Sequence, residues 1–185
     1  MKKLLVLASL LLTTVAGAAR YAPATGSSVT VEGTSTLHAW TMTGATIKGQ
    51  IDAASPDKAK VVVSIPVTSI KSEHAKMDKL MAEALKADKN PEIRYELLQS
   101  SLTKGNPEAN FAVAAKGKLT IAGVTRDVEL AVTGARNTEG KYVLTGTAPL
   151  KMTEFGIKPP TAMMGTIKTG DDVKVTFRWI VEPTQ

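Results

Sequence analysis

Apolar and polar residues alternate along most of the chain, and this alternation predicts β-strands. Near the C-terminus, Val173, Val175, Phe177 and Trp179 share one parity, with Lys174 and other polar residues between them. A period of two places one face of a strand on apolar material and the other in water. Turn-forming residues separate the segments, so we expect an all-β domain built as an antiparallel sandwich or barrel. Eight segments show the pattern, at about residues 28–33, 36–51, 60–68, 91–102, 109–122, 125–134, 141–152 and 172–182.

One segment, residues 72–86, has the period of a helix instead. Lysines fall on the side opposite its apolar residues, which is typical of an amphipathic helix. Ser72 is the expected N-cap, and Asn90-Pro91 ends any continuation. We therefore expect one helix of about four turns after the third strand. The apolar residues recur at i, i+3, i+4, i+7 and i+8, namely Met77, Leu80, Met81, Ala84 and Leu85.

A second segment, residues 155–171, fits neither period. It contains glycines and Pro159-Pro160, so we expect no regular structure there. Long loops are uncommon and tend to be functional. This one carries several large apolar side chains, and we expect them to cover a barrel mouth or an apolar ligand. They are Phe155, Ile157, Met163, Met164 and Ile167.

The N-terminus has the layout of a secretory signal peptide. Lys2 and Lys3 precede an apolar run over residues 4–15, and Ala16-Gly17-Ala18 forms a small-residue cleavage site. We expect a signal peptide over residues 1–18 and one domain over residues 19–185, exported to the periplasm, the cell envelope or the medium. The alternative is an uncleaved N-terminal anchor, although the run is short for a membrane span.

Composition favours a binding or structural module over an enzyme. The chain has no cysteine and only two histidines, so zinc fingers, thiolate clusters and cysteine nucleophiles are excluded. His74 and Asp78 stand four residues apart on the predicted helix, which is a weak pair for a metal. We expect no metal, no cofactor and no catalytic residue. The formal net charge of +6 and an aromatic content of 4% also argue against nucleic-acid binding.

Four stretches, in order along the chain, together resemble the YceI family of exported proteins associated with lipid and polyisoprenoid binding. They are VEGTSTLHAW at residues 31–40, residues 63–91 with SIPVTSIKS, GKLTIAGVTRDV at residues 117–128, and LKMTEFGIKPPTAMMG at the start of residues 150–175. The resemblance implies a lipocalin-like, eight-stranded antiparallel β-barrel with a helix after strand three. It also implies an elongated apolar cavity for an isoprenoid chain, such as a polyprenyl phosphate or a quinone tail.

An apolar cavity would be lined by the inward side chains of the strands, with methionines adapting to an irregular ligand. Burial contributes about 25 cal/mol per Å² of apolar area, so a long chain can bind with few polar contacts. The alternative is a structural or interaction domain whose barrel is filled by its own side chains. The candidate ligand-binding residues are Trp40, Val63, Ile65, Val67, Met77, Leu80, Met81, Ile93, Tyr95, Phe111, Val113, Phe155, Met163, Met164 and Phe177.

Basic residues add a candidate contact to a phosphate head group or to an anionic membrane surface, if helix and loop flank one mouth. A solvated helix face, balanced by nearby acidic residues, explains them equally simply. We expect His38 to bond a head group or a backbone carbonyl. The lysines are Lys71, Lys76, Lys79, Lys86 and Lys89 around the helix, with Lys158 and Lys168 in the loop.

Overall fold

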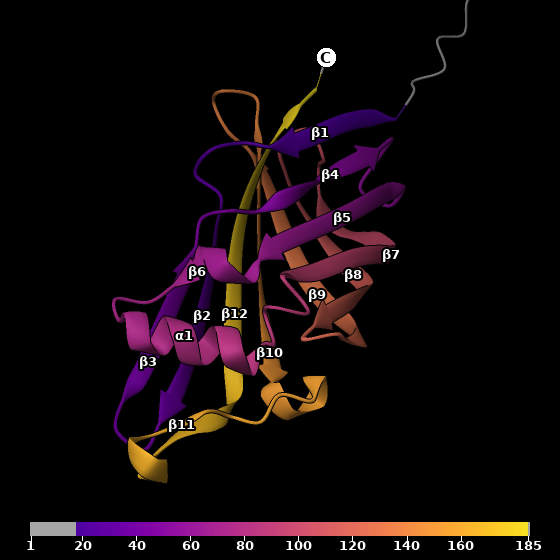
Figure 1. Cartoon of the computed structure of the whole chain (residues 1–185). Helices are drawn as coiled ribbons and strands as arrows, with labels where there is room; N and C mark the ends of the chain where they lie inside the picture. The colour runs from indigo at the N-terminus through magenta and orange to yellow at the C-terminus, as the bar shows by residue number, and fades with distance from the viewer. Residues whose placement is uncertain (1–17, 185) are drawn as a thin grey trace, which may run out of the picture.

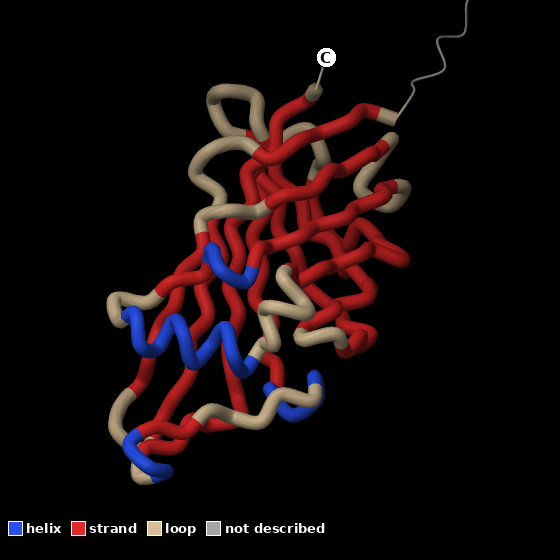
Figure 2. The backbone as a smooth tube through the Cα atoms, in the orientation of Figure 1, coloured by secondary structure: helices blue, strands red, loops and turns tan. Residues whose placement is uncertain are grey.

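The computed structural model describes residues 18–184, which fold into antiparallel β-sheet with one α-helix (Figure 1). The helical segments gather on the side of the molecule away from the C-terminus (Figure 2). The elements are β1 (Ala19–Pro23), β2 (Ser28–Ser35), β3 (Ala39–Gly44), β4 (Lys48–Ala53), β5 (Ala59–Pro66), the 3₁₀ helix η1 (Val67–Ser69), β6 (Ile70–Lys71), α1 (Ala75–Ala84), β7 (Glu92–Gly105), β8 (Asn110–Ile121), β9 (Val124–Arg136), β10 (Tyr142–Lys151), η2 (Met152–Phe155), β11 (Thr161–Ala162), η3 (Met163–Gly165) and β12 (Ile167–Pro183).

The sheet closes on itself. Its strands follow the order β1-β4-β5-β7-β8-β9-β10-β12, and β1 pairs back onto β12 with Tyr21 opposite Pro183. Within residues 18–184 these eight strands form a closed antiparallel barrel, which confirms the predicted fold class and excludes the open sandwich. Below β1, β2 pairs with the same edge of β12, β3 pairs with β2, and β6 pairs with β3.

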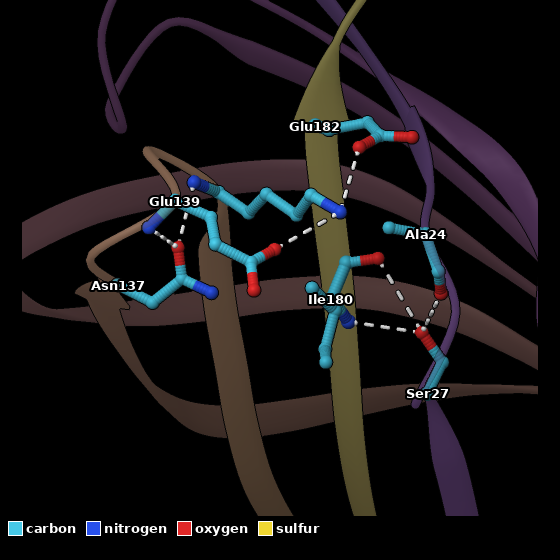
Figure 3. Close-up of polar contacts among 7 residues, drawn as sticks. Ala24, Ser27, Asn137, Glu139, Ile180 and Glu182 are labelled. Atoms are coloured by element: carbon cyan, nitrogen blue, oxygen red, sulfur yellow. Dashed lines mark hydrogen bonds and ion pairs between the residues drawn. The ribbon is translucent and has the colours of Figure 1, made fainter.

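Three of the barrel strands are each broken into two pieces by a bend. The pieces are β1 and β2, β3 and β4, and β5 and β6, and each lies beside the next along the chain. At the first bend, the buried Ser27 hydroxyl donates to Ala24 O at 3.0 Å and accepts from Ile180 N–H at 3.0 Å (Figure 3). At the bend, no backbone carbonyl of the described neighbouring strand accepts from Ile180 N–H. The Ser27 hydroxyl supplies the acceptor instead, because a buried backbone N–H needs a partner.

The turn between β9 and β10 is fixed beside the same strand. Asn137 Oδ1 accepts hydrogen bonds from the backbone N–H of Glu139 and of Lys141 (Figure 3). Lys141 Nζ lies 3.1 Å from a carboxylate oxygen of Glu182 on β12 and 3.3 Å from one of Glu139. This cluster ties the turn to β12 near the point where β1 closes the ring.

Most of the predicted segments match strands, but several boundaries differ. The strand β1 was not predicted, and β12 begins at Ile167 rather than at residue 172, because the stretch Thr169 to Asp171 does not alternate. The predicted irregular segment holds the last residue of η2, the strand β11, the 3₁₀ helix η3 and the start of β12, with which β11 pairs. The helix covers Ala75–Ala84 instead of residues 72–86.

The predicted N-cap is also wrong, since the N-cap residue is His74. Ser72 instead donates both its backbone N–H and its hydroxyl to Asp78 Oδ1, at 2.7 and 2.8 Å. These bonds hold the pKa of the Asp78 carboxyl below its usual range, because they favour the ionised form.

The predicted signal peptide falls outside the described residues apart from Ala18, where the chain is exposed. Among the helices of residues 18–184, none is long and apolar enough to cross a membrane.

Helix α1 packs across one end of the barrel. Its Met77 and Met81 contact the buried cluster of Val29, Met42 and Ile70. Its C-terminal residues contact a second buried cluster, made by Ile121, Ala122, Phe155 and Ile157 from the β8–β9 turn and the segment after β10. We call this the helix end, and the opposite end, formed by the β4–β5, β7–β8 and β9–β10 turns, the turn end.

Candidate functional site

The interior of the barrel holds a cavity of about 330 Å³. Side chains from β1, β2, β4, β5 and β7 to β10 and from β12 line it, and nearly all of them are apolar. Such a volume lies near the lower limit of ordinary ligand pockets, roughly 300–1,000 Å³. Lining residues include Val31, Ile51, Val61, Val63, Ile65, Ile93, Tyr95, Leu97, Phe111, Val113, Val128, Leu130, Val132, Leu144, Val175, Phe177 and Trp179.

Some of the inward side chains are incompletely buried, although others, such as Trp179, are buried. Val63, Leu130 and Phe177 face the interior, yet each is only half-buried. In a filled barrel the inward face would be solid core, as it is at the helix end, where Phe155 is 2% exposed. The inward face of the strands therefore borders open space.

Glycines opposite aromatic residues explain why the aromatic rings leave this space free. Phe111 on β8 pairs in register with Gly134 on β9, and Phe177 on β12 pairs with Gly146 on β10. A methyl group built on Gly134 would stand 2.2 Å from Cζ of Phe111, and one on Gly146 would stand 2.6 Å from Cζ of Phe177. Each ring therefore lies against the glycine backbone and along the barrel wall.

Tyr95 lies against the wall in the same way. A methyl group on Gly117 would stand 2.5 Å from its ring atoms and from its hydroxyl. The hydroxyl of Tyr95 and Nε1 of Trp179 are buried and have no hydrogen-bond partner within residues 18–184. Burial raises the pKa of Tyr95 to about 12, so its phenol stays neutral. These groups therefore supply no base or anion to the cavity.

The cavity reaches the turn end of the barrel. Its lining includes Ser55 and Pro56 from the β4–β5 turn and Pro107 and Glu108 from the β7–β8 turn. The Ser100 hydroxyl donates to Pro56 O at 2.6 Å and so fixes the β4–β5 turn to β7. At the other end, the lining is apolar and lies next to the buried clusters under α1. We infer that the turn end is the mouth.

Polar groups of the site gather at this rim. Arg136 Nη1 lies 3.3 Å from Glu108 Oε2, and its guanidinium lies over the Tyr142 ring at 5.9 Å from the centroid. Tyr142 in turn packs edge-on against Tyr21 and Phe111, with ring centroids 5.6 and 6.1 Å away. Burial and the nearby Glu108 carboxylate raise the pKa of Tyr142. The rim therefore presents phenol rings and the Arg136–Glu108 ion pair beside an apolar lumen.

The predicted ligand-binding residues divide into two groups. Seven of them line the cavity, all in the described part of the chain: Val63, Ile65, Ile93, Tyr95, Phe111, Val113 and Phe177. The other eight lie elsewhere: Trp40, Val67, Met77, Leu80, Met81, Phe155, Met163 and Met164.

The residues outside the lining have other surroundings. Val67 and Phe155 are buried in packing, and Met77 and Met81 pack at the helix end. The ring of Trp40 lies against Gly33, and its Nε1 donates to Thr34 O at 3.0 Å. Leu80 is half-buried on α1, and Met163 and Met164 are exposed. A role of these residues in ligand binding stays a prediction.

The lysine contact depended on the condition that helix and loop flank one mouth, and both lie at the helix end, away from the mouth inferred above. Helix α1 and the segment with Lys158 and Lys168 belong to the helix end, because α1 and residues 155–157 pack on the buried clusters there. The lysines of both segments therefore do not surround the turn end. His38 Nδ1 bonds the carbonyl of Ala39 at 2.6 Å, one of its two expected partners. Within residues 18–184, no three carboxylate or histidine groups are placed to hold a metal ion.

Several lining residues were not singled out from the sequence. Trp179 shares the parity of Val175 and Phe177, and Leu144 faces Trp179 across the β10–β12 ladder. Tyr21 belongs to the unpredicted strand β1. Parity marked Trp179 as facing the same way as its neighbours, whereas only the closed ring shows that β1 contributes to the wall.

Comparisons with known proteins agree with this architecture. The model of the YceI-like domain matches residues 21–180. A UPF0312 protein of Pseudomonas putida (strain W619) is 34% identical over 125 residues, which is 63% of this chain and 62% of that protein. A UPF0312 protein of Pseudomonas syringae pv. tomato is 30% identical over 138 residues, 70% of this chain and 66% of that protein. The chain thus spans slightly less than two thirds of the length of the curated relatives it matches.

Two solved structures share the fold at low sequence identity. BcnA of Burkholderia cenocepacia superposes with a TM-score of 0.69 at 20% identity and covers 83% of this chain and 95% of that one. A structure described as a polyisoprenoid binding domain from Saccharophagus degradans has a TM-score of 0.69 at 14% identity, covering 90% and 99%. At these identities the likeness shows the barrel fold.

Proposed function

The chain belongs to the YceI-like domain family, and on this premise we propose that it binds an isoprenoid-type amphiphile in its barrel and carries or sequesters it without chemistry. The observation that carries the proposal is the hollow, apolar interior of about 330 Å³. A structural neighbour is described as a polyisoprenoid binding domain, which supports the same class of ligand.

The distribution of polar groups suits a ligand with an apolar tail and a small polar head. A prenyl tail has no hydrogen-bonding groups along its length, so an apolar wall is sufficient to hold it, at about 25 cal/mol per Å² of buried area. The polar head would remain at the turn end, beside Arg136, Glu108 and Ser55. Polyprenyl phosphates and quinone-like molecules both have this form.

Open space in the barrel favours binding over a purely structural role. Several inward side chains are half-buried, and the aromatic rings lie against glycines, so the barrel interior contains unfilled space. A barrel with a purely structural role would not need this space. Unfilled apolar volume destabilises a folded protein unless something occupies it.

The test is to purify the full chain, extract it with organic solvent and identify apolar compounds by mass spectrometry, together with uptake of a fluorescent prenyl probe. We expect a prenyl-bearing compound, and saturable uptake. Ile65 lines the cavity, so Ile65→Trp should abolish both. Val62→Trp is the matched control, because Val62 lies three residues away on β5 and is 41% exposed outside the barrel. A wild-type protein with neither extract nor uptake would refute the proposal.

We further propose that the protein acts outside the cytoplasm, after removal of residues 1–18. The support is the charged, apolar and small-residue order of that segment. Mass spectrometry of protein recovered from the periplasm or the medium should show an N-terminus at Ala19 or Arg20. Recovery of the intact chain from the cytosol would contradict export.

A further inference from the structure

Three large apolar side chains are exposed to solvent at the outer extremity of the helix end. The side chain of Leu37 in the β2–β3 loop is 66% exposed, and Met163 and Met164 in η3 are 66% and 106% exposed. The two segments meet, because Thr36 N–H donates to Lys168 O at 2.9 Å. Figure 1 shows β11 and the short helix after it at the extremity of the molecule farthest from the C-terminus. We call Leu37, Met163 and Met164 the apolar tip.

The tip is held in place. Lys168 N–H donates to Thr36 Oγ1 at 3.1 Å, and β11 pairs with the start of β12 on either side of η3. Backbone hydrogen bonds on both flanks therefore fix the position from which Met163 and Met164 project. The two methionines therefore lie on a turn that hydrogen bonds fix on both sides.

The backbone under the methionines is strained. Met163 has φ of 51° and Met164 of 56°, and Gly165 follows at 89°. Two consecutive side-chain-bearing residues in the left-handed region are unfavourable, since that region suits glycine. Packing within the described chain does not offset this strain, because both side chains lie in water. Strain of this kind clusters at functional sites in proteins.

The charges carried by the tip segments are of one sign. Residues 34–41 and 158–170, which include the β2–β3 loop, β11 and η3, contain no aspartate or glutamate. Lys158 and Lys168 are exposed there and form no ion pair within residues 18–184. Bare apolar groups flanked by unpaired lysines complement a surface with an apolar interior and anionic phosphates.

We propose that the apolar tip docks the protein onto the surface of a bilayer that contains anionic phospholipid. The side chains of Leu37, Met163 and Met164 enter the boundary between head groups and acyl chains, while Lys158 and Lys168 contact lipid phosphates. The tip does not line the cavity, so this docking is independent of the proposed ligand.

A site-specific probe tests the docking in the full chain. Because the chain has no cysteine, Met164→Cys creates a unique attachment point for a polarity-sensitive fluorophore. Vesicles of phosphatidylglycerol mixed with phosphatidylcholine should shift its emission to the blue, and nitroxide-labelled lipids should quench it. The matched control is Leu98→Cys, since Leu98 is a 57% exposed leucine on the barrel strand β7. Its probe should not shift.

Two further variants separate the apolar and charged contributions. Met163→Ser, made in the Met164→Cys chain, should weaken the vesicle affinity read by the probe by about tenfold, because less apolar area enters the lipid. Lys158→Gln with Lys168→Gln should remove the preference for phosphatidylglycerol. Lys58→Gln with Lys104→Gln, at the turn end, changes the charge equally and should leave that preference unchanged.

Three results would overturn the proposal. The first is a probe at position 164 that stays in water while the protein sediments with vesicles, which would assign the binding to another segment. The second is an equal shift with pure phosphatidylcholine. The third is a shift that depends on protein concentration without lipid, which would show that the tip contacts a second copy of the chain.

Discussion

Replacing Gly134 by alanine should close part of the lumen without loosening the fold. The backbone at Gly134 is extended, so alanine is compatible with it, and in a strand alanine is favoured over glycine by about 0.5–1 kcal/mol. The new methyl group would stand 2.2 Å from Cζ of Phe111, so the ring must leave the wall. In a solid core such overpacking costs about 1–3 kcal/mol. Here the ring has open space to enter.

The free energy of unfolding should therefore stay within about 1 kcal/mol of the wild type, which corresponds to a Tm change below about 4 °C. Uptake of a prenyl probe should weaken by about tenfold or more, because the ring occupies volume that the ligand would fill. Excluding one side-chain-sized piece of the ligand costs about 1.5–3 kcal/mol, and 1.4 kcal/mol is a factor of ten in affinity.

Thermal unfolding and fluorescence titration measure the two quantities on the same samples. A second variant supplies the control: Phe111→Ala added to Gly134→Ala removes the ring and should restore uptake. The reasoning fails if Gly134→Ala lowers stability by the full overpacking cost while uptake is unchanged. That outcome would show that the interior is tight at this level and that the ligand binds elsewhere.

Three more outcomes follow from the structure. Ile65→Trp should leave thermal unfolding cooperative and abolish prenyl uptake, whereas a wild-type affinity would show that Ile65 does not border the bound ligand. Tyr95→Phe should keep or raise the unfolding free energy by up to about 1 kcal/mol, because the Tyr95 hydroxyl is buried without a partner, and a clear loss of stability would reveal a missing hydrogen bond. The lowered pKa of Asp78 means that its ionised form stabilises the fold; that stability is complete above the unfolded pKa of about 3.9 and is lost as the pH falls through the lower folded pKa. Asp78→Asn should therefore lower Tm at neutral pH and flatten the acid limb of a Tm-against-pH curve, and an unchanged acid limb would contradict the role of the Ser72 bonds.

The alternation of apolar and polar residues identified the strands because each strand has one side that faces solvent. It failed at β1, whose five residues include a proline and show no period, and at the start of β12, where Thr169, Gly170 and Asp171 interrupt the pattern. The helix was predicted correctly because one side of it packs on two buried clusters, which gives its apolar residues a helical period in the sequence. Its first turn was placed three residues early, because the Ser72 side chain bonds to Asp78 rather than to the N-terminal backbone of the helix.

The lumen itself could not be predicted from periodicity. Alternation shows that Val113 and Phe111 face the same side, but a filled and a hollow barrel have the same pattern. The difference depends on the cross-strand register that sets Phe111 against Gly134 and Phe177 against Gly146, and register joins residues that lie far apart in the sequence. The same is true of the mouth, since the helix period says nothing about which end of a barrel the helix covers.

The strand β12 carries a consequence for how the molecule assembles. It alone among the described strands pairs with β10 on one edge and with both β1 and β2 on the other, linking positions as distant as Tyr21 and Pro183. Until it arrives, the edges of β10 and β2 both present unpaired backbone groups to any passing chain. Pairing of β12 therefore covers both of these edges, and slow pairing of β12 would favour aggregation over ring closure.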